Sequence, residues 1–190
     1  MRKASLGWFL PVVLSAVLLV VSGSQKAWAQ PSDTAANRLA SLRYTELPLG
    51  SILPKGWLLH QLQIMRDGTT GHLDEVYEKI KNDNGWLGGK GDGWEETPYW
   101  LDGAVPLAYL LNDEQLKSKV LKYINWTLTN QRPSGYFGPI TKWERETGKK
   151  ITPENCGEGE DWWPKMVMLK VMQQYFTASN DMRVISFMSA

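Results

Sequence analysis

Two apolar helical stretches separated by an Asn-Asp pair constrain the fold of this chain more than any other feature. Residues 102–111 are apolar nearly all round, which indicates a helix buried on most sides. Residues 114–131 carry apolar side chains at helical spacing. Pro106 falls near the start of the first stretch, where a missing N–H is least harmful. The short break at Asn112-Asp113 therefore predicts an antiparallel α-hairpin.

The same punctuation returns near the end of the chain. Residues 162–177 predict a third long helix, because a proline opens it and its apolar side chains cover a broad arc. Asn180-Asp181 follows, and then a new apolar run begins. The other expected elements are helices over residues 56–66 and 71–84 and a loop over residues 142–159. No segment shows a strand period, so the expected fold class is all-α, with stacked α-hairpin repeats.

The stretch of residues 85–103 indicates a binding surface. It holds six glycines, three of the chain's ten tryptophans and one tyrosine. Four carboxylates accompany them: Asp92, Glu95, Glu96 and Asp102. Sugar rings stack their apolar C–H faces on indole, and their hydroxyls need acceptors at fixed positions. The pattern predicts a sugar-binding cleft, with a glycine-rich loop whose tryptophans fill a core as the alternative.

Individual residues of this stretch, and of the later Trp-Trp pair, become site candidates. Glycosidic hydrolysis usually takes two carboxyl groups, and Glu95 and Asp102 are the catalytic candidates. Pro98 argues against one continuous helix through both, and helix-start statistics favour a helix N-cap over a catalytic role for Asp102. The candidates for stacking on a sugar are Trp94, Tyr99, Trp100, Trp162 and Trp163. Adjacent tryptophans cannot both face one cleft from a helix, so two or three of this set are expected in the core. The substrate-binding candidates are Trp94, Glu96, Tyr99, Trp100, Asp161 and Trp162.

The N-terminal residues have the pattern of an export signal. A basic start, an apolar run of about a dozen residues and Ala27-Trp28-Ala29 predict a signal peptide over residues 1–29, cleaved after Ala29. The run is shorter than the roughly 20 residues that a membrane span needs. We therefore expect a secreted or periplasmic protein with a flexible mature N-terminus over residues 30–46 and a folded domain over residues 47–190.

Composition excludes two classes of partner. The predicted leader carries three of the 21 basic residues and no acid, so 18 basic residues remain against 20 acidic ones. A net charge of about −2 gives no electrostatic footprint for nucleic acid or, after signal cleavage, for a membrane surface. Cys156 is the only cysteine, so an internal disulfide is excluded and stability depends on a packed core.

Four motifs together give the chain a family resemblance. From about Leu47 onward it resembles the N-terminal part of secreted proteins related to the β-L-arabinofuranosidases of glycoside hydrolase family 127. The motifs are PKGWL at residues 54–58, GTTGHLDE at residues 68–75, WEETPYWLDG at residues 94–103 and DWWP at residues 161–164. The resemblance implies an (α/α)6 toroid, in which inner helices surround a cleft, and a carbohydrate substrate. It also implies a longer protein, of which this chain is an N-terminal fragment without activity of its own.

The resemblance implies a zinc site, but this sequence lacks the ligands for one. Members of the family use a zinc-bound cysteine nucleophile with further cysteines and a glutamate around the metal. Cys156 has no second cysteine or nearby histidine, so no metal ligand and no cofactor are assigned to this chain. The expected function is that of an exported glycoside hydrolase. The alternatives are a non-catalytic glycan-binding remnant and another α-toroid enzyme, such as a glucuronyl hydrolase or a lyase.

Overall fold

The computed structural model describes residues 43–91, 94–152, 154–155 and 162–190 of this 190-residue chain. The chain divides into two units, Met1–Tyr44 and Thr45–Ala190, and nearly all described residues belong to the second. The described residues form helices and no strands, which confirms the all-α prediction. The predicted signal peptide, Cys156 and Asp161 lie outside the described residues.

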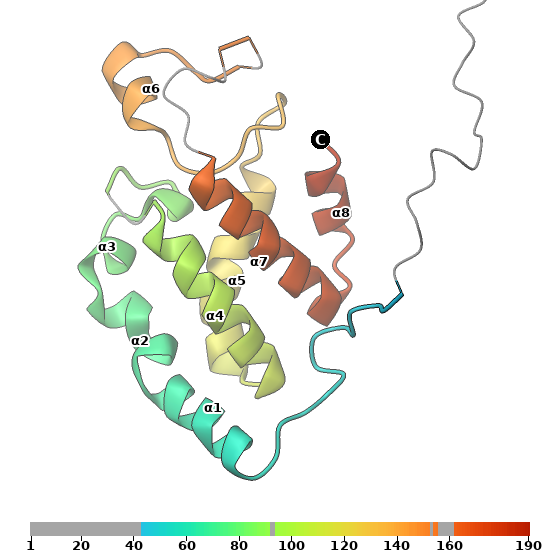
Figure 1. The fold of residues 1–190 in the computed structure, drawn as a ribbon. Helices are drawn as coiled ribbons and strands as arrows, with labels where there is room; N and C mark the ends of the chain where they lie inside the picture. The colour runs from blue at the N-terminus through green and yellow to red at the C-terminus, as the bar shows by residue number, and fades with distance from the viewer. Residues whose placement is uncertain (1–42, 92–93, 153, 156–161) are drawn as a thin grey trace, which may run out of the picture. The chain divides into compact units, whose positions relative to one another are not determined.

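Three long helices make up the centre of the second unit, and shorter ones surround them (Figure 1). The long helices are α4 (Glu96–Leu110), α5 (Glu114–Thr129) and α7 (Trp163–Ser179). The most extensive helix–helix contact joins α4 to α7. These two helices run in the same direction, while α5 and α8 run the opposite way (Figure 1). The shorter elements are α1 (Trp57–Asp67), α2 (Thr69–Val76), α3 (Glu78–Lys81), the 3-10 helix η2 (Gly85–Leu87), α6 (Lys142–Thr147) and α8 (Arg183–Met188).

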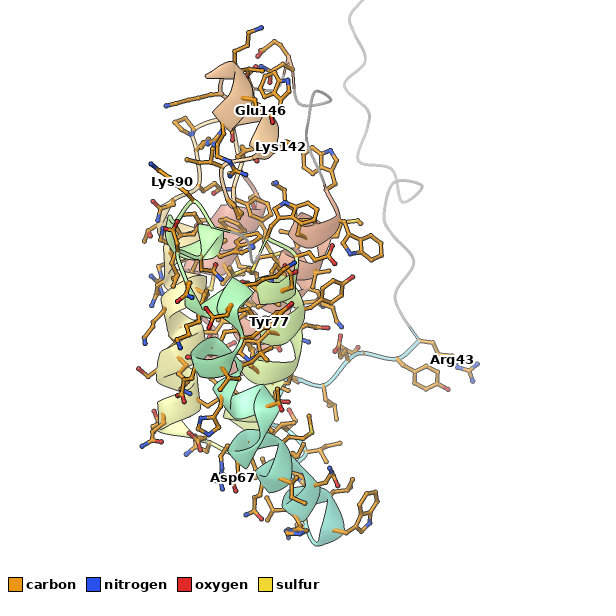
Figure 2. The ribbon with its side chains drawn as sticks, turned by 90° about the vertical axis from the view of Figure 1, so that its left-hand side faces the viewer. Arg43, Asp67, Tyr77, Lys90, Lys142 and Glu146 are labelled. Atoms are coloured by element: carbon orange, nitrogen blue, oxygen red, sulfur yellow. The ribbon has the colours of Figure 1, made fainter. Side chains whose placement is uncertain are left out.

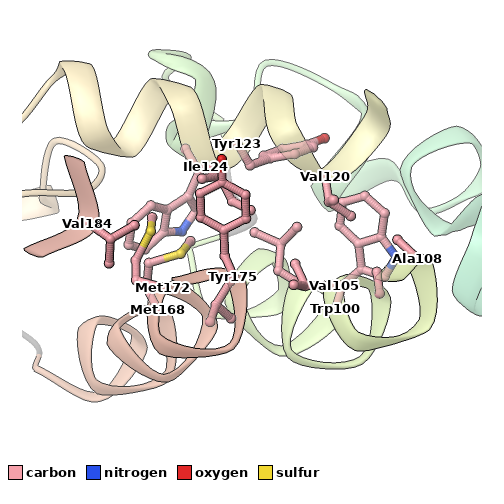
Figure 3. Close-up of a cluster of buried hydrophobic side chains, with 14 of the residues drawn as sticks. Trp100, Val105, Ala108, Val120, Tyr123, Ile124, Met168, Met172, Tyr175 and Val184 are labelled. Atoms are coloured by element: carbon pink, nitrogen blue, oxygen red, sulfur yellow. The ribbon is translucent and has the colours of Figure 1, made fainter. Parts of the chain in front are cut away.

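The core lies where α4, α5 and α7 meet (Figure 3). Val105 of α4, Ile124 of α5 and Met172 of α7 are fully buried there. Tyr175 and Met168 extend the same cluster along α7. Burial of such side chains stabilises a fold by about 1.5–3 kcal/mol each. In contrast, α1 has no buried residue, although it contacts α2 and α4.

The two Asn-Asp pairs have the same local structure. Asn112 and Asn180 both adopt positive φ, at 50° and 55°, and each ends a long helix. Asparagine tolerates this left-handed conformation better than most residues. Asp113 then accepts a hydrogen bond from the backbone N–H of Leu116 and caps α5. Asp181 accepts one from the N–H of Arg183 at the start of α8. The repeated dipeptide thus makes two similar helix–turn–helix connections, α4–α5 and α7–α8.

Helix α4 begins earlier than its sequence predicts. It starts at Glu96 rather than at Asp102, so the expected break at Pro98 and the N-cap role of Asp102 are wrong. Pro98 lies in the first turn, where backbone N–H groups have no partner inside the helix, so proline is tolerated there. Pro106 consequently lies well inside the helix. Because Pro106 has no N–H, the carbonyl of Asp102 loses its intrahelical partner, and the Gln174 side-chain amide donates to it at 3.4 Å.

The segment predicted as a loop over residues 142–159 contains a helix. Thr141 and Glu144 form a reciprocal capping box at the start of α6, and Gly148 ends it with φ 68°. The T-x-x-E spacing is a helix-start signature, so the sequence carried a signal that the loop prediction missed. Lys142 and Glu146 lie side by side on the exposed side of α6 (Figure 2).

The predicted helix over residues 71–84 is also divided. Tyr77 has an extended backbone, with ψ 112°, and separates α2 from α3. Its carbonyl accepts from the N–H groups of both Ile80 and Lys81, which starts the new helix in a different direction. The turn allows Ile80 to reach the core, where it is 1% exposed. Burial of this side chain explains why the chain departs from a single helix.

Candidate functional site: the exposed face of α4 and α7

Helices α4 and α7 share one face that stays exposed or half-buried among the described residues, with the extended residues 46–49 beside part of it. On α4, Tyr99, Asp102 and Pro106 are exposed or half-buried, at spacings that place them on one side of the helix. The matching side of α7 carries Trp163, Met166, Lys170, Gln173 and Gln174. Opposite sides of both helices enter the core. We call this set of residues the α4/α7 face.

An aromatic pair occupies the N-terminal end of this face. The indole Nε1–H of Trp163 donates to the hydroxyl oxygen of Tyr99 at 2.5 Å. Both side chains remain accessible, with 52% of Trp163 and 45% of Tyr99 exposed. Large aromatic side chains are usually more buried than this. The hydrogen bond joins the two side chains, so two partly exposed aromatic rings lie next to each other, and we call them the Tyr99–Trp163 platform.

A polar cluster lies along the α4/α7 face, beyond the aromatic pair. The Asp102 carboxylate accepts from Lys170 Nζ at 2.9 Å and from Gln174 Nε2 at 2.8 Å. The cluster joins the two helices and leaves further N–H donors on Lys170, whose side chain is exposed. Aromatic and polar groups on one accessible surface are what a sugar ring requires.

A cavity adjoins this polar cluster. Its volume is about 250 Å³, and it lies between the extended residues 46–49 and the two helices. Lys170 and Gln174, the two partners of Asp102, line it, together with Pro106 on the next turn of α4. The remaining lining residues are Glu46, Leu47, Leu49, Gln173 and Thr177. The α4/α7 face is therefore hollowed beside Asp102.

Trp100 does not belong to this face. Its side chain is 5% exposed, its Nε1–H donates to the carbonyl of Thr70 at 2.8 Å, and its ring meets the edge of Tyr123. Trp100 follows Tyr99 by one residue, which turns it by about 100° around the helix and into the core. The expectation that Trp100 stacks on substrate is corrected, because neither face of its ring is accessible.

The other predicted binding residues make contacts outside the α4/α7 face. Trp94 is half-buried, and its carbonyl accepts from the indole of Trp86. Glu96 forms an ion pair with Lys79 of α3 at 2.6 Å. Trp162 is 53% exposed but lines a different cavity of about 290 Å³, with Tyr136, Phe137 and Lys165 among its neighbours. The structure thus places Tyr99 and Asp102 on the α4/α7 face, while Glu96 pairs with Lys79 and Trp162 lines the other cavity.

The two catalytic candidates lie on one helical stripe but far apart along it. Glu95 is the N-cap of α4, and Asp102 follows seven residues later. At about 1.5 Å per residue their backbones are separated by roughly 10 Å along the axis. Retaining glycosidases hold their carboxyls about 5 Å apart and inverting ones about 6.5–9.5 Å apart. Because the backbone separation exceeds both carboxyl separations, the two side chains would have to lean toward each other to reach either one. Lys170 already engages Asp102.

The carboxyl groups with the largest pKa shifts lie away from this face. Hydrogen bonds from Lys119 and His72 lower the pKa of Glu75 to about 2. A hydrogen bond from the Arg183 guanidinium, with further donors, lowers the pKa of Asp181 to about 2. Both groups join neighbouring helices or cap them. These shifts reflect structural ion pairs, which perturb a pKa as effectively as an active site does.

Searches for metal-ligand groups and membrane-spanning helices among the described residues, and for similar proteins, gave no matches. Within the described ranges, no three His, Cys, Asp or Glu side chains are grouped closely enough to hold a metal ion. Among the same residues, no helix has the length and apolarity needed to cross a bilayer. The chain matches no family model, no curated protein and no solved structure.

Sequence reasoning missed the α7 side of this face. Lys170, Gln173 and Gln174 are polar residues on a helix that is otherwise largely apolar, and they lie seven, ten and eleven residues after Trp163. That spacing repeats the helical period and places all four residues on one side. This polar stripe, which begins at Trp163, was therefore the sequence signal for an exposed side of α7. The sequence does not indicate which helix packs beside that stripe.

Proposed function

We propose that this chain binds a glycan on the α4/α7 face, as part of an exported glycoside hydrolase of the β-L-arabinofuranosidase kind. The observation that carries the proposal is the exposed Tyr99–Trp163 pair on the same face as the Asp102–Lys170–Gln174 cluster. An aromatic platform beside charged hydrogen-bonding groups matches the mixed apolar and hydroxylated surface of a sugar.

The arrangement of the helices supports a toroidal assembly as the setting for this face. Helices α4 and α7 are parallel neighbours, and α5 and α8 return in the opposite direction (Figure 1). In an (α/α)6 toroid, parallel inner helices present one face to the central cleft, and outer helices cover the other. We propose that α4 and α7 are two inner helices and that the α4/α7 face lines the cleft.

A second function, glycan binding without hydrolysis, is favoured by the state of Asp102. Its carboxylate is engaged by Lys170 and Gln174, which suits a role in holding the two helices and orienting hydroxyls. A general acid must instead be protonated at the moment of bond cleavage. Under this second function the same face binds the same ligand, so the binding test below applies to both.

Trp163→Ala is expected to weaken binding of an arabino-oligosaccharide about tenfold, because one half of the platform is removed. A loss of about 1.4 kcal/mol corresponds to that factor. This is within the range expected for an aromatic contact together with the free energy of burying apolar surface. Isothermal titration calorimetry on the full chain measures the change.

Trp162→Ala is the matched control, since the two neighbouring tryptophans are almost equally exposed. It should leave the affinity within about twofold of the wild type. Loss of binding in the Trp162 variant alone would place the glycan in the other cavity and contradict the proposed site. Equal, unchanged binding in both variants would contradict it as well.

A further inference from the structure

We infer that the cavity between residues 46–49 and the α4/α7 face is a subsite for one ring of a neutral sugar, with Gln174 Oε1 accepting a hydroxyl hydrogen bond. The inference rests on the proposed function in taking the ligand to be a carbohydrate. It adds a second position on the face, distinct from the Tyr99–Trp163 platform.

The orientation of the Gln174 amide is fixed by its neighbours. Pro106 leaves the carbonyl of Asp102 without its helical donor, and the Asp102 carboxylate also only accepts. Gln174 must therefore turn its Nε2 toward Asp102, where it donates to Oδ1 at 2.8 Å and to the carbonyl oxygen at 3.4 Å. Since the amide is planar, Oε1 faces away from Asp102.

This oxygen lacks the partner that a buried acceptor needs. Within the described residues, Gln174 Oε1 is buried and receives no hydrogen bond. A buried polar atom without a partner destabilises a fold by about 1–3 kcal/mol, and such atoms are rare in folded proteins. Gln174 also lines the cavity. A donor supplied from the cavity side would complete the hydrogen bonding of the amide.

The size of the cavity fits a single sugar ring. Its volume of about 250 Å³ lies below the roughly 300–1,000 Å³ of pockets for drug-sized ligands. The lining combines apolar surface from Leu47, Leu49 and Pro106 with polar groups from Gln173 and Gln174. Sugar rings present the same combination of C–H faces and hydroxyls.

The charges around the cavity favour a neutral ligand over an anion. Lys170 is the cation in the lining, and its charge is already matched by Asp102 at 2.9 Å. Glu46 adds a carboxylate to the same wall. An anionic ligand would meet this second negative charge, whereas hydroxyl groups can donate to Glu46 and accept from Lys170.

The side-chain amide resonance of Gln174 in the full chain tests the subsite directly. In ¹⁵N-resolved spectra of the wild type, L-arabinose and D-glucose are each titrated to high millimolar concentration. We expect the Gln174 amide pair to shift in a saturable way with at least one of them. The amide of Gln61, an exposed residue of α1, is the internal control and should not move. A Gln174 resonance that stays fixed with both sugars assigns the cavity to water and overturns the inference.

Gln174→Met assigns the resonance and tests the side-chain amide. It keeps the side-chain length and removes both Oε1 and the Nε2 donor to Asp102, so the affinity of the free sugar should fall about tenfold, while Gln61→Met should leave it unchanged. Unaltered affinity in a folded Gln174→Met variant would refute the role of Oε1. The wild-type titration remains decisive if the variant does not fold.

Failure of this inference is distinguishable from failure of the proposed function. Shifts at Trp163 with an oligosaccharide, and none at Gln174 with any sugar, would retain the platform and remove the subsite. Shifts at Gln174 with free sugars, and none at Trp163 with an oligosaccharide, would retain the subsite and remove the platform.

Discussion

Trp100→Ala is expected to lower the free energy of unfolding by about 3–5 kcal/mol, the usual range for removing a buried tryptophan. The ring packs edge-on against Tyr123 at 5.4 Å between centroids, and its Nε1–H donates to the carbonyl of Thr70. Truncation would create a cavity and remove the indole donor to that carbonyl. Urea unfolding followed by circular dichroism measures the loss.

Trp57→Ala provides the comparison, since Trp57 is the exposed first residue of α1. It should change stability by less than about 0.5 kcal/mol. A Trp100 variant as stable as the Trp57 variant would mean that the ring lies outside the core, and would return Trp100 to the set of binding candidates.

Glu144→Gln is expected to destabilise the chain by about 3 kcal/mol, because this carboxylate organises residues 132–151. It receives two hydrogen bonds from Arg132, at 2.6 and 3.1 Å, and one each from the backbone N–H groups of Thr141 and Ile151. Glu144 is buried, so an amide in its place would leave Arg132 poorly paired. Breaking a buried ion pair from one side typically destabilises by about 3–5 kcal/mol, and the partial exposure of Arg132 places this case at the lower end.

The effect of Glu144 depends on pH with a defined sign. Burial alone would raise the pKa of Glu144, but the bonds from Arg132, Ile151 and Thr141 outweigh it and hold the pKa below its ordinary value of 4.5. A carboxyl with a lowered folded-state pKa stabilises fully above its unfolded pKa and loses that contribution as the pH falls through the folded value. The difference between wild type and Glu144→Gln should therefore be largest near neutral pH and shrink below about pH 4.5.

Glu146→Gln is the matched control on the same helix. Glu146 faces Lys142 at 3.6 Å on the exposed side of α6, and surface pairs of this kind contribute at most about 1 kcal/mol (Figure 2). Chemical unfolding of both variants at pH 7 and pH 3 gives the comparison. Equal losses in the two variants, or a Glu144 effect that grows toward pH 3, would contradict the role assigned to Glu144.

The sequence predicted the helical hairpins because their signals are local. Apolar spacing located α4, α5 and α7, and the two Asn-Asp pairs located the turns between hairpin helices. The predictions were wrong at the start of α4 and over α6, where a local rule depends on where the helix begins. The meaning of Pro98 and Pro106 depends on where α4 begins, and apolar spacing alone does not locate that start. The capping box at Thr141 and Glu144 starts a helix despite the polar composition around it.

The site was only partly predictable, because it depends on which helices become neighbours. Tyr99 and Asp102 were identified from residue type and clustering. Trp100 belonged to the same cluster, and its burial follows from a turn of about 100° per residue around α4. Lys170 and Gln174 lie 68 and 72 residues from Asp102. Only the packing of α7 against α4 brings them together.

The indole N–H resonances of the chain's ten tryptophans test most directly whether the α4/α7 face binds a glycan. The measurement is a titration of the full ¹⁵N-labelled chain with an arabino-oligosaccharide. We predict that the Trp163 resonance shifts most, since its N–H is held by Tyr99 on the exposed platform, while the buried Trp86 and Trp100 stay unchanged. Saturable shifts confined to tryptophans other than Trp163, or no shift in any of them, would contradict the account.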